Sequence, residues 1–141
     1  MFDVPRLLVE TEPDPADLAL LEEGVAAAVT ARAGIGDERE FGIFLRDDQG
    51  RAVAGISGLV WGGNCALQAM WVDARLRGHG LGRALMEAAE CEARRQDCAL
   101  VTFHAYDLVG RQLYEALDYE TVGVIEGSPP GSVTRWYCKT L

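Results

Sequence analysis

The amino-acid sequence predicts a mixed α/β domain whose central sheet is mostly antiparallel and flanked by helices. Two observations lead to this fold class. Three strand-like segments follow one another without a helix between them, whereas an alternating parallel sheet would place a helix after each strand. Later segments alternate between helical spacing of apolar residues and short apolar runs. With 141 residues, 49% of them hydrophobic and 25% charged, the chain is expected to form one domain over residues 1–141.

The first predicted elements are a short strand and a helix. Residues 6–10 form a short apolar segment that is expected to be an opening strand. Asp14 and Pro15 match a helix start, because Asp caps free backbone N–H groups and Pro fits the first helical position. The helix is expected to end before Gly34. Apolar residues at helical spacing predict one face of this helix, formed by Leu18, Leu21, Val25, Ala28 and Val29.

Three strands are predicted next, one directly after another. Residues 41–46 and 52–61 are separated by a short polar turn, which is typical of a hairpin. A second turn at residues 62–64 leads into a central apolar strand that ends at Asp73. This order places three consecutive antiparallel strands before the middle of the chain.

The last part of the chain is expected to contain two strands after one strand and one short helix. Residues 98–103 are continuously apolar, as expected of a strand covered on both faces. Residues 119–126 and 133–139 predict two final strands joined by a turn with two prolines. Asp107 is expected to cap the short helix, whose apolar residues are Val109, Leu113, Ala116 and Leu117.

A glycine-rich loop follows the central strand and precedes a longer helix. Gly78, Gly80 and Gly82 stand at alternate positions after Arg77, and helical spacing of apolar residues continues to about Gln96. Glycine lets the backbone approach a bulky anion, a helix start offers unpaired N–H groups, and Arg adds a fixed cation. The loop is therefore expected to bind phosphate. Two commoner phosphate loops fit badly, because neither a Gly-Lys-Ser/Thr ending nor a G-x-G-x-x-G spacing is present.

The loop Arg77-Gly-His-Gly80-Leu-Gly82 resembles the R/Q-x-x-G-x-G/A signature of the GNAT superfamily of acyl-CoA-dependent N-acyltransferases. The order of the predicted elements is similar to the GNAT fold over nearly the whole chain. A second segment resembles the family pattern Asn-x-x-Ala-x-x-x-Tyr-Glu-x-x-Gly-Phe. The family's Tyr and Glu are matched by Tyr114 and Glu115, whereas other residues stand at three of its positions, namely Asp107, Gly110 and Asp118.

The resemblance implies that the chain binds acetyl-CoA. In the family, the glycine loop holds the pyrophosphate and the preceding strand lies along the pantetheine arm. The main chains of Met70 and Val72 are then expected to bind pantetheine, while His79 occupies a free position of the motif and is expected to contact solvent or phosphate. The cofactor-binding residues that the resemblance implies are Met70, Trp71, Val72, Arg77, Gly78, His79, Gly80, Leu81, Gly82, Arg83 and Asp107.

The resemblance also implies that Tyr114 is the general acid. A phenol with a pKa of about 10 can protonate a departing thiolate whose conjugate acid has a pKa of about 8.5. The alternative for Tyr114 is a buried helix aromatic with only a packing role. The general base is left open among a water beside Gln68, Asp73, His104 and Asp107. Direct attack in a ternary complex is expected, because none of the four cysteines has an evident His partner in the sequence.

These features predict an N-acetyltransferase that acts on a primary amine of a small molecule or peptide. Two alternatives are a non-catalytic acyl-CoA-binding or sensor domain and a nucleotide-binding module. The formal net charge of −9 argues against nucleic acid and anionic membrane as partners and favours a cationic acceptor.

The sequence gives no indication of a metal site, a leader or a membrane span. Its cysteines form no C-x-x-C pair and have no His at metal-binding spacing, so no metal is expected. No basic-then-apolar leader and no apolar run of membrane-spanning length are seen. We therefore expect a cytoplasmic protein, and a homodimer is left open.

Overall fold

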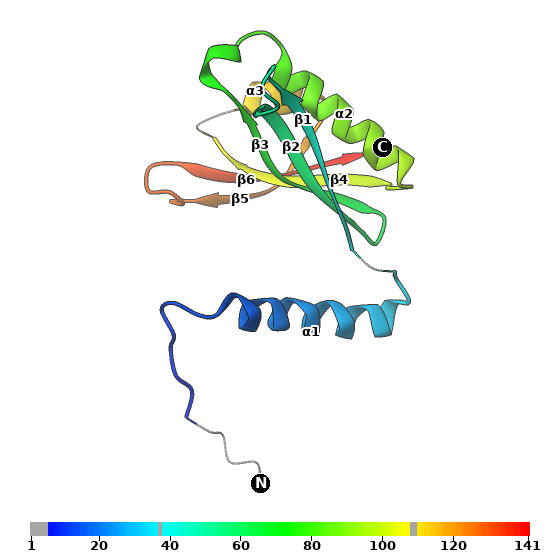
Figure 1. Cartoon of the computed structure of the whole chain (residues 1–141), viewed down its shortest axis with the longest axis vertical. Coiled ribbons are helices and arrows are strands. Elements are labelled where there is room, and N and C mark those ends of the chain that lie inside the picture. The colour runs from blue at the N-terminus through cyan, green and yellow to red at the C-terminus, as the bar shows by residue number, and fades with distance from the viewer. Residues whose placement is uncertain (1–5, 37, 108–109) are drawn as a thin grey trace. The chain divides into compact units, whose positions relative to one another are not determined.

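The computed structural model describes residues 6–36, 38–107 and 110–141 (Figure 1). The chain divides into two compact units, residues 1–36 and 37–141, which are described separately below. One domain over residues 1–141 therefore stays a prediction.

Over its described residues, 6–36, the first unit contains a single helix, α1 (Pro15–Ala33), which begins and ends where the sequence predicts. The Asp14 carboxylate accepts a hydrogen bond from the Ala16 N–H at 2.9 Å. Gly34 ends the helix in the left-handed region with φ 65°, and its N–H donates to the Thr30 carbonyl. No residue of α1 is buried, and its large apolar side chains are between 40% and 66% exposed.

The predicted opening strand at residues 6–10 is wrong, because this segment has no regular secondary structure. None of the described strands pairs with it. A strand needs a hydrogen-bonded neighbour as well as apolar side chains, and a short apolar run carries no information about such a neighbour.

The second unit is built on one six-stranded sheet with the order β1-β2-β3-β4-β6-β5. Every neighbouring pair is antiparallel except β3 and β4, which are parallel. The predicted mixed α/β fold with a mostly antiparallel sheet is confirmed. The strands are β1 (Arg39–Arg46), β2 (Ala52–Trp61), β3 (Asn64–Val72), β4 (Leu100–Tyr106), β5 (Glu120–Glu126) and β6 (Val133–Thr140), and the helices are η1 (Ala74–Leu76), α2 (Leu81–Arg95) and α3 (Arg111–Ala116).

Both larger helices of the second unit lie on the same face of the sheet (Figure 1). α2 packs across β1 to β4, and α3 places Tyr114 against Phe103 of β4. Side chains alternate between the two faces of each strand, and the buried side chains of β2 and β4 lie on the face beneath the helices. We call this face the helix face and the opposite one the outer face of the sheet.

Within the second unit only one face of β4 is covered, and coverage of both faces stays a prediction for the whole chain. Val101 and Phe103 are buried on the helix face, whereas Leu100, His104 and Tyr106 on the outer face are exposed. A continuous apolar run is therefore compatible with a strand that has one open face in this unit. The polar side chains exposed on this face, His104 and Tyr106, are therefore accessible within this unit.

The predicted cap of the short helix is also wrong. α3 begins at Arg111 after Gly110, and the Asp107 carboxylate instead accepts hydrogen bonds from the Arg135 Nε at 2.8 and 3.0 Å. Residues 108 and 109, where the sequence predicts the first helical turn, lie outside the described residues. Asp107 is thus bound by a strand residue 28 positions later in the chain.

A buried charged group ties α2 to the end of the sheet. Glu90 on α2 is 5% exposed and accepts hydrogen bonds from the Tyr119 hydroxyl at 2.9 Å and from the Lys139 Nζ at 2.9 and 3.1 Å. Burial, followed by the charge of Glu90, raises the pKa of Tyr119, so its hydroxyl stays a donor. The carboxylate therefore has two hydrogen-bond partners, and Arg94 Nη1 lies 3.9 Å from it.

Replacing Glu90 with Ala is expected to lower the free energy of unfolding by about 3–5 kcal/mol, because Lys139 would lose its partner in a buried setting. Urea unfolding followed by circular dichroism measures this change. Glu87→Ala, one turn earlier on α2, is the control: Glu87 pairs with Arg83 at an exposed site, where ion pairs contribute little. Equal losses in the two variants would contradict the assigned role of Glu90.

Candidate active site

The parallel strands β3 and β4 pair over a short stretch and then diverge. Only Asn64–Ala66 pair with Leu100–Thr102. Beyond this point, residues 67–72 pair with β2 alone and residues 103–106 pair with β6 alone. We call these two unpaired edges, residues 67–72 and 103–106, the β3–β4 split. Their facing main-chain N–H and C=O groups are available to hydrogen-bond an extended molecule between the strands.

A β-bulge at Gln68 lies at the start of the split. Ser57 pairs with Ala69 and Gly58 pairs with Leu67, so Gln68 has no partner on β2. A bulge bends its strand and increases the local twist. The bulge therefore accounts for the direction in which β3 leaves β4. The hydropathy of the segment contains no signal of this extra residue.

The glycine loop follows the end of β3 after the single turn of η1. Gly78 and Gly80 have φ values of 79° and 81°, which favour glycine. A Cβ atom placed on either residue would meet no other atom within 4 Å. The outer side of this backbone is thus open among the described residues, as a cradle for a bulky anion requires.

The start of α2 supplies the hydrogen-bond donors of this cradle. Gly80 provides no side-chain cap, and the first main-chain bond of the helix runs from the Ala84 N–H to the Gly80 carbonyl at 3.1 Å. The N–H groups of Leu81, Gly82 and Arg83 donate to no acceptor in the described part of the chain. Such N–H groups, together with the helix dipole, favour an anion.

Side chains of the loop hold it against β3. The Arg77 Nε donates to the Val72 carbonyl at 2.9 Å, and the His79 Nδ1 lies 3.2 Å from the Leu76 carbonyl oxygen. Val72 therefore uses its carbonyl to position Arg77 beside the loop. Arg83, in the first turn of α2, pairs with Glu87 at 3.0 Å.

The structure separates the predicted cofactor residues of β3 between the two faces of the sheet. Met70 lies on the helix face, where its Cε would be 3.8 Å from a Cβ on Gly82. Val72 lies on that same face, since alternate residues share a face. Trp71 lies on the outer face and is 53% exposed. Its main chain belongs to the split, and its side chain lies on the opposite face of the sheet from Met70.

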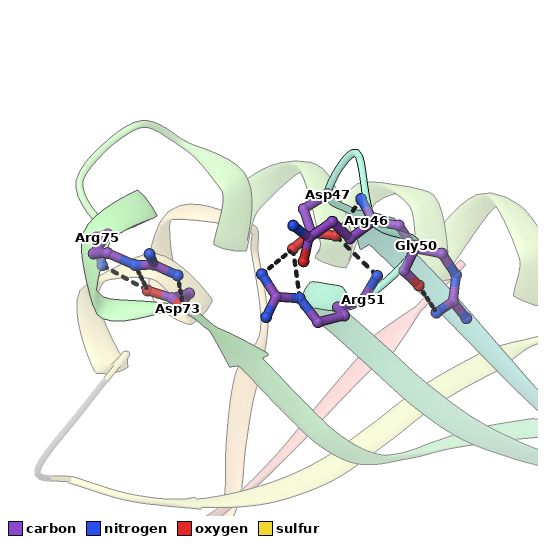
Figure 2. Close-up of polar contacts among 7 residues, drawn as sticks. Arg46, Asp47, Gly50, Arg51, Asp73 and Arg75 are labelled. Atoms are coloured by element: carbon purple, nitrogen blue, oxygen red, sulfur yellow. Dashed lines mark hydrogen bonds and ion pairs between the residues drawn. The ribbon is translucent and has the colours of Figure 1, made fainter.

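Asp73 at the end of β3 is bound by arginine. Its two carboxylate oxygens accept hydrogen bonds from Arg75 at 3.0 and 2.9 Å, and Figure 2 shows this pair beside the similar pair of Asp47 and Arg51. The hydrogen bonds from Arg75 lower the pKa of Asp73 to about 2. A carboxylate with such a pKa is a poor base near neutral pH.

Asp107 at the end of β4 is bound in the same way. Its carboxylate accepts from Arg135, and Arg111 Nη1 lies 3.9 Å from it. Asp73 and Asp107, the two carboxylates among the candidate bases, are thus both hydrogen-bonded to arginine. Sequence reasoning missed Arg135, because no local pattern connects it with Asp107.

α3 brings Tyr114 to the first residue of β4 beyond its pairing with β3. The ring of Tyr114 packs edge-on against Phe103, with centroids 4.7 Å apart, and lies 5.2 Å from the ring of Tyr137. Tyr114 is 8% exposed, and burial raises the pKa of its hydroxyl. The phenol therefore stays protonated near neutral pH and can act as a proton donor.

Gly110 makes room for the Tyr114 ring. A Cβ on Gly110 would lie 2.9 Å from the Tyr114 hydroxyl oxygen and 2.8 Å from the ring, and Gly110 has a φ of 83°. The glycine that replaces the alanine of the motif thus has a steric reason in this chain. The sequence shows the replacement, but not the contact that explains it.

The most buried cysteine, Cys65, is unsuited to act as a nucleophile. Cys65 is buried, and burial raises the pKa of its thiol to about 12, so it is not a thiolate nucleophile. The described residues contain no cluster of three or more His, Cys, Asp or Glu that could hold a metal ion.

Within the same residues, no helix has the length and apolar character needed to cross a membrane.

Comparisons with known proteins agree with this architecture. The sequence profile of the acetyltransferase (GNAT) family matches residues 6–119. Blasticidin-S acetyltransferase of Streptomyces morookaense is 28% identical over 143 aligned residues and is covered completely, as is this chain.

Two crystal structures share the fold. An acetyltransferase candidate from Agrobacterium tumefaciens superposes with a TM-score of 0.90 at 23% identity, covering 97% of this chain and 100% of its own. An aminoglycoside 6′-N-acetyltransferase in complex with coenzyme A has a TM-score of 0.61 at 17% identity, with 72% of each chain covered.

Proposed function

The chain belongs to the acetyltransferase (GNAT) family and is an acetyl-CoA-dependent N-acetyltransferase, and we propose that the β3–β4 split, the glycine loop and Tyr114 form its active site. The observation that carries this proposal is the juxtaposition at the end of β3. An open glycine cradle, an uncapped helix start and a pair of diverging strands follow one another within a short segment.

The residues present fit coenzyme A. The pyrophosphate is expected to bind the N–H groups of the loop and of the first turn of α2, with Arg77 as the cation. The pantetheine arm is expected to bind the main chain of the split. Bound acetyl-CoA supplies an activated thioester. The residues proposed to hold it are Met70, Trp71 and Val72 through their main chain, Arg77, Gly78, His79, Gly80, Leu81, Gly82 and Arg83 at the phosphates, and Asp107 at the end of β4.

Tyr114 is proposed to protonate the departing thiolate. Its raised pKa keeps the proton on the phenol until a stronger base forms beside it. The acceptor amine is proposed to attack directly, since none of the four cysteines has an evident His partner in the sequence and the Cys65 thiol is buried. A non-catalytic acyl-CoA-binding protein would have no use for a protonated phenol at the split.

We expect cationic amines to be the preferred acceptors. The net charge of −9 attracts cations over roughly 10 Å at moderate ionic strength, and a relative that matches this chain over its full length is named for blasticidin S. Thiol release from acetyl-CoA is measured with blasticidin S, an aminoglycoside and aspartate. The kcat/KM of the cationic acceptors should be highest and should fall as salt is added.

Aspartate is the control for charge in this experiment. If aspartate is the best acceptor at low salt, the electrostatic argument is wrong. Binding of acetyl-CoA without thiol release from any amine would instead favour the non-catalytic alternative. A cytoplasmic location and a homodimer belong to the same proposal, and sedimentation of the purified protein tests the homodimer.

A further inference from the structure

Two side chains with proton chemistry lie on opposite faces of β4 beside the split. Tyr114 packs against Phe103 on the helix face. His104 is the next residue of the strand, so its side chain lies on the outer face, where it is exposed. β4 pairs with β3 only as far as Thr102. Both side chains therefore lie where β4 has just lost its partner.

The His104 ring is held in place by its neighbour on β6. His104 pairs in register with Trp136, and their ring centroids are 4.6 Å apart with an interplanar angle of 36°. Trp136 is 42% exposed, so this contact orients the imidazole without enclosing it. An imidazole has a pKa of about 6.5 in water and accepts protons near neutral pH.

The titratable groups that share the outer face with His104 come from three strands. They are Tyr106 of β4, Cys138 of β6 and Glu120 of β5. Glu120 pairs with Cys138 on the edge strand, one strand farther from His104 than β6. The residues of β3 that share this face, such as Trp71 and Ala69, do not titrate. Asp73 and Asp107 at the strand ends are bound by Arg75 and Arg135, as described above.

We propose that His104 is the general base that removes a proton from the acceptor amine. This inference rests on the proposed function and adds to it the side from which the acceptor arrives. The glycine loop and Tyr114 occupy the helix face, so the amine is expected to enter from the outer face. The base then lies on the outer face, where the amine arrives, and the acid lies on the helix face, from which the departing thiolate is protonated.

The proton balance closes with these two residues. His104 takes one proton from the ammonium group and releases it to solvent, and the neutral amine nitrogen forms the new C–N bond as the C–S bond breaks. The departing sulfur takes the Tyr114 hydroxyl proton. The nitrogen loses its second proton to His104, which releases it to solvent, and Tyr114 takes one proton back from solvent. One proton is released to solvent for each amide and thiol formed.

The test is the pH dependence of kcat/KM for His104→Gln, measured with the best cationic acceptor of the panel above. At pH 7 we expect a loss of about 10²–10⁴-fold, the range for a missing general base. An alkyl amine with a pKa of about 10.4 becomes neutral by itself as the pH rises. The difference between the parent and variant proteins should therefore shrink to less than about tenfold near pH 10.

A control variant and a binding measurement separate this role from a structural one. Tyr106→Phe changes the next outer-face residue of β4 and should keep the pH profile of the parent protein. Acetyl-CoA affinity should be equal in all three proteins. A loss in His104→Gln that is the same at every pH, or no loss at all, overturns the role of His104. A parent protein that acetylates no amine overturns the proposed function, and this inference with it.

Discussion

Replacing Tyr114 with Phe is expected to lower kcat by about 10²–10⁴-fold, the range for a lost general acid. The substitution removes one hydroxyl and keeps the ring that packs against Phe103. Acetyl-CoA affinity should change little, since one hydrogen bond contributes only about 0.5–1.5 kcal/mol. The measurement is a pH–rate profile of both proteins at saturating acetyl-CoA, with thermal melts as the control for folding.

The pH profile distinguishes catalysis from packing. Burial raises the pKa of Tyr114, so the parent protein keeps its acid over the neutral range and should lose the contribution of that acid only when the phenol ionises at high pH. The variant should lack this loss, because its thiolate departs with water as the acid. Profiles that overlay across the whole range would remove Tyr114 from the mechanism.

Replacing Gly80 with Val is expected to raise the Kd for coenzyme A by about 100-fold or more. The branched side chain would occupy the open side of the cradle, where a phosphate must approach the backbone. Loss of two hydrogen bonds to a charged group, at about 1.5–3 kcal/mol each, corresponds to that factor. Titration calorimetry with coenzyme A measures the Kd directly.

Gly63→Val is the matched control. Gly63 has a φ of 77°, close to the 81° of Gly80, and a Cβ there also meets nothing within 4 Å. It lies in the turn between β2 and β3, at the opposite end of β3 from the loop. The two variants share the strain of a left-handed valine, and only Gly80→Val should lose affinity. An unchanged Kd in folded Gly80→Val would refute the assignment of the loop.

Features encoded by neighbouring residues were predictable from the sequence. Asp14, Pro15 and Gly34 set the limits of α1 through local capping, and those limits are confirmed. The glycine loop between a strand and a helix was predictable for the same reason, since alternate glycines and a helical run are visible in one short segment. The mixed sheet followed from the order of such segments.

Features that depend on distant residues were not predictable. The Asp107 carboxylate meets Arg135 from another strand, and this pairing replaces the expected helix cap. The open face of β4 depends on which elements cover the sheet, and a run of apolar residues does not contain that information. The roles of Tyr114 and of the cofactor residues stay predictions, now with a geometry in which they can be tested.

The contact between Glu90 and Lys139 bears on whether the protein can acetylate its own lysine. Lys139 is the only lysine of the 141 residues, and its ammonium group lies 2.9 Å from Glu90 with 19% of the side chain exposed. An amine must be free to attack before it can be acetylated, and the Lys139 Nζ instead donates hydrogen bonds to both Glu90 oxygens, at 2.9 and 3.1 Å. The other basic side chains are arginines, which stay protonated, and two histidines. The folded protein thus presents no free ε-amino group to compete with the acceptor, and acetylation of Lys139 would require its ammonium group to leave Glu90.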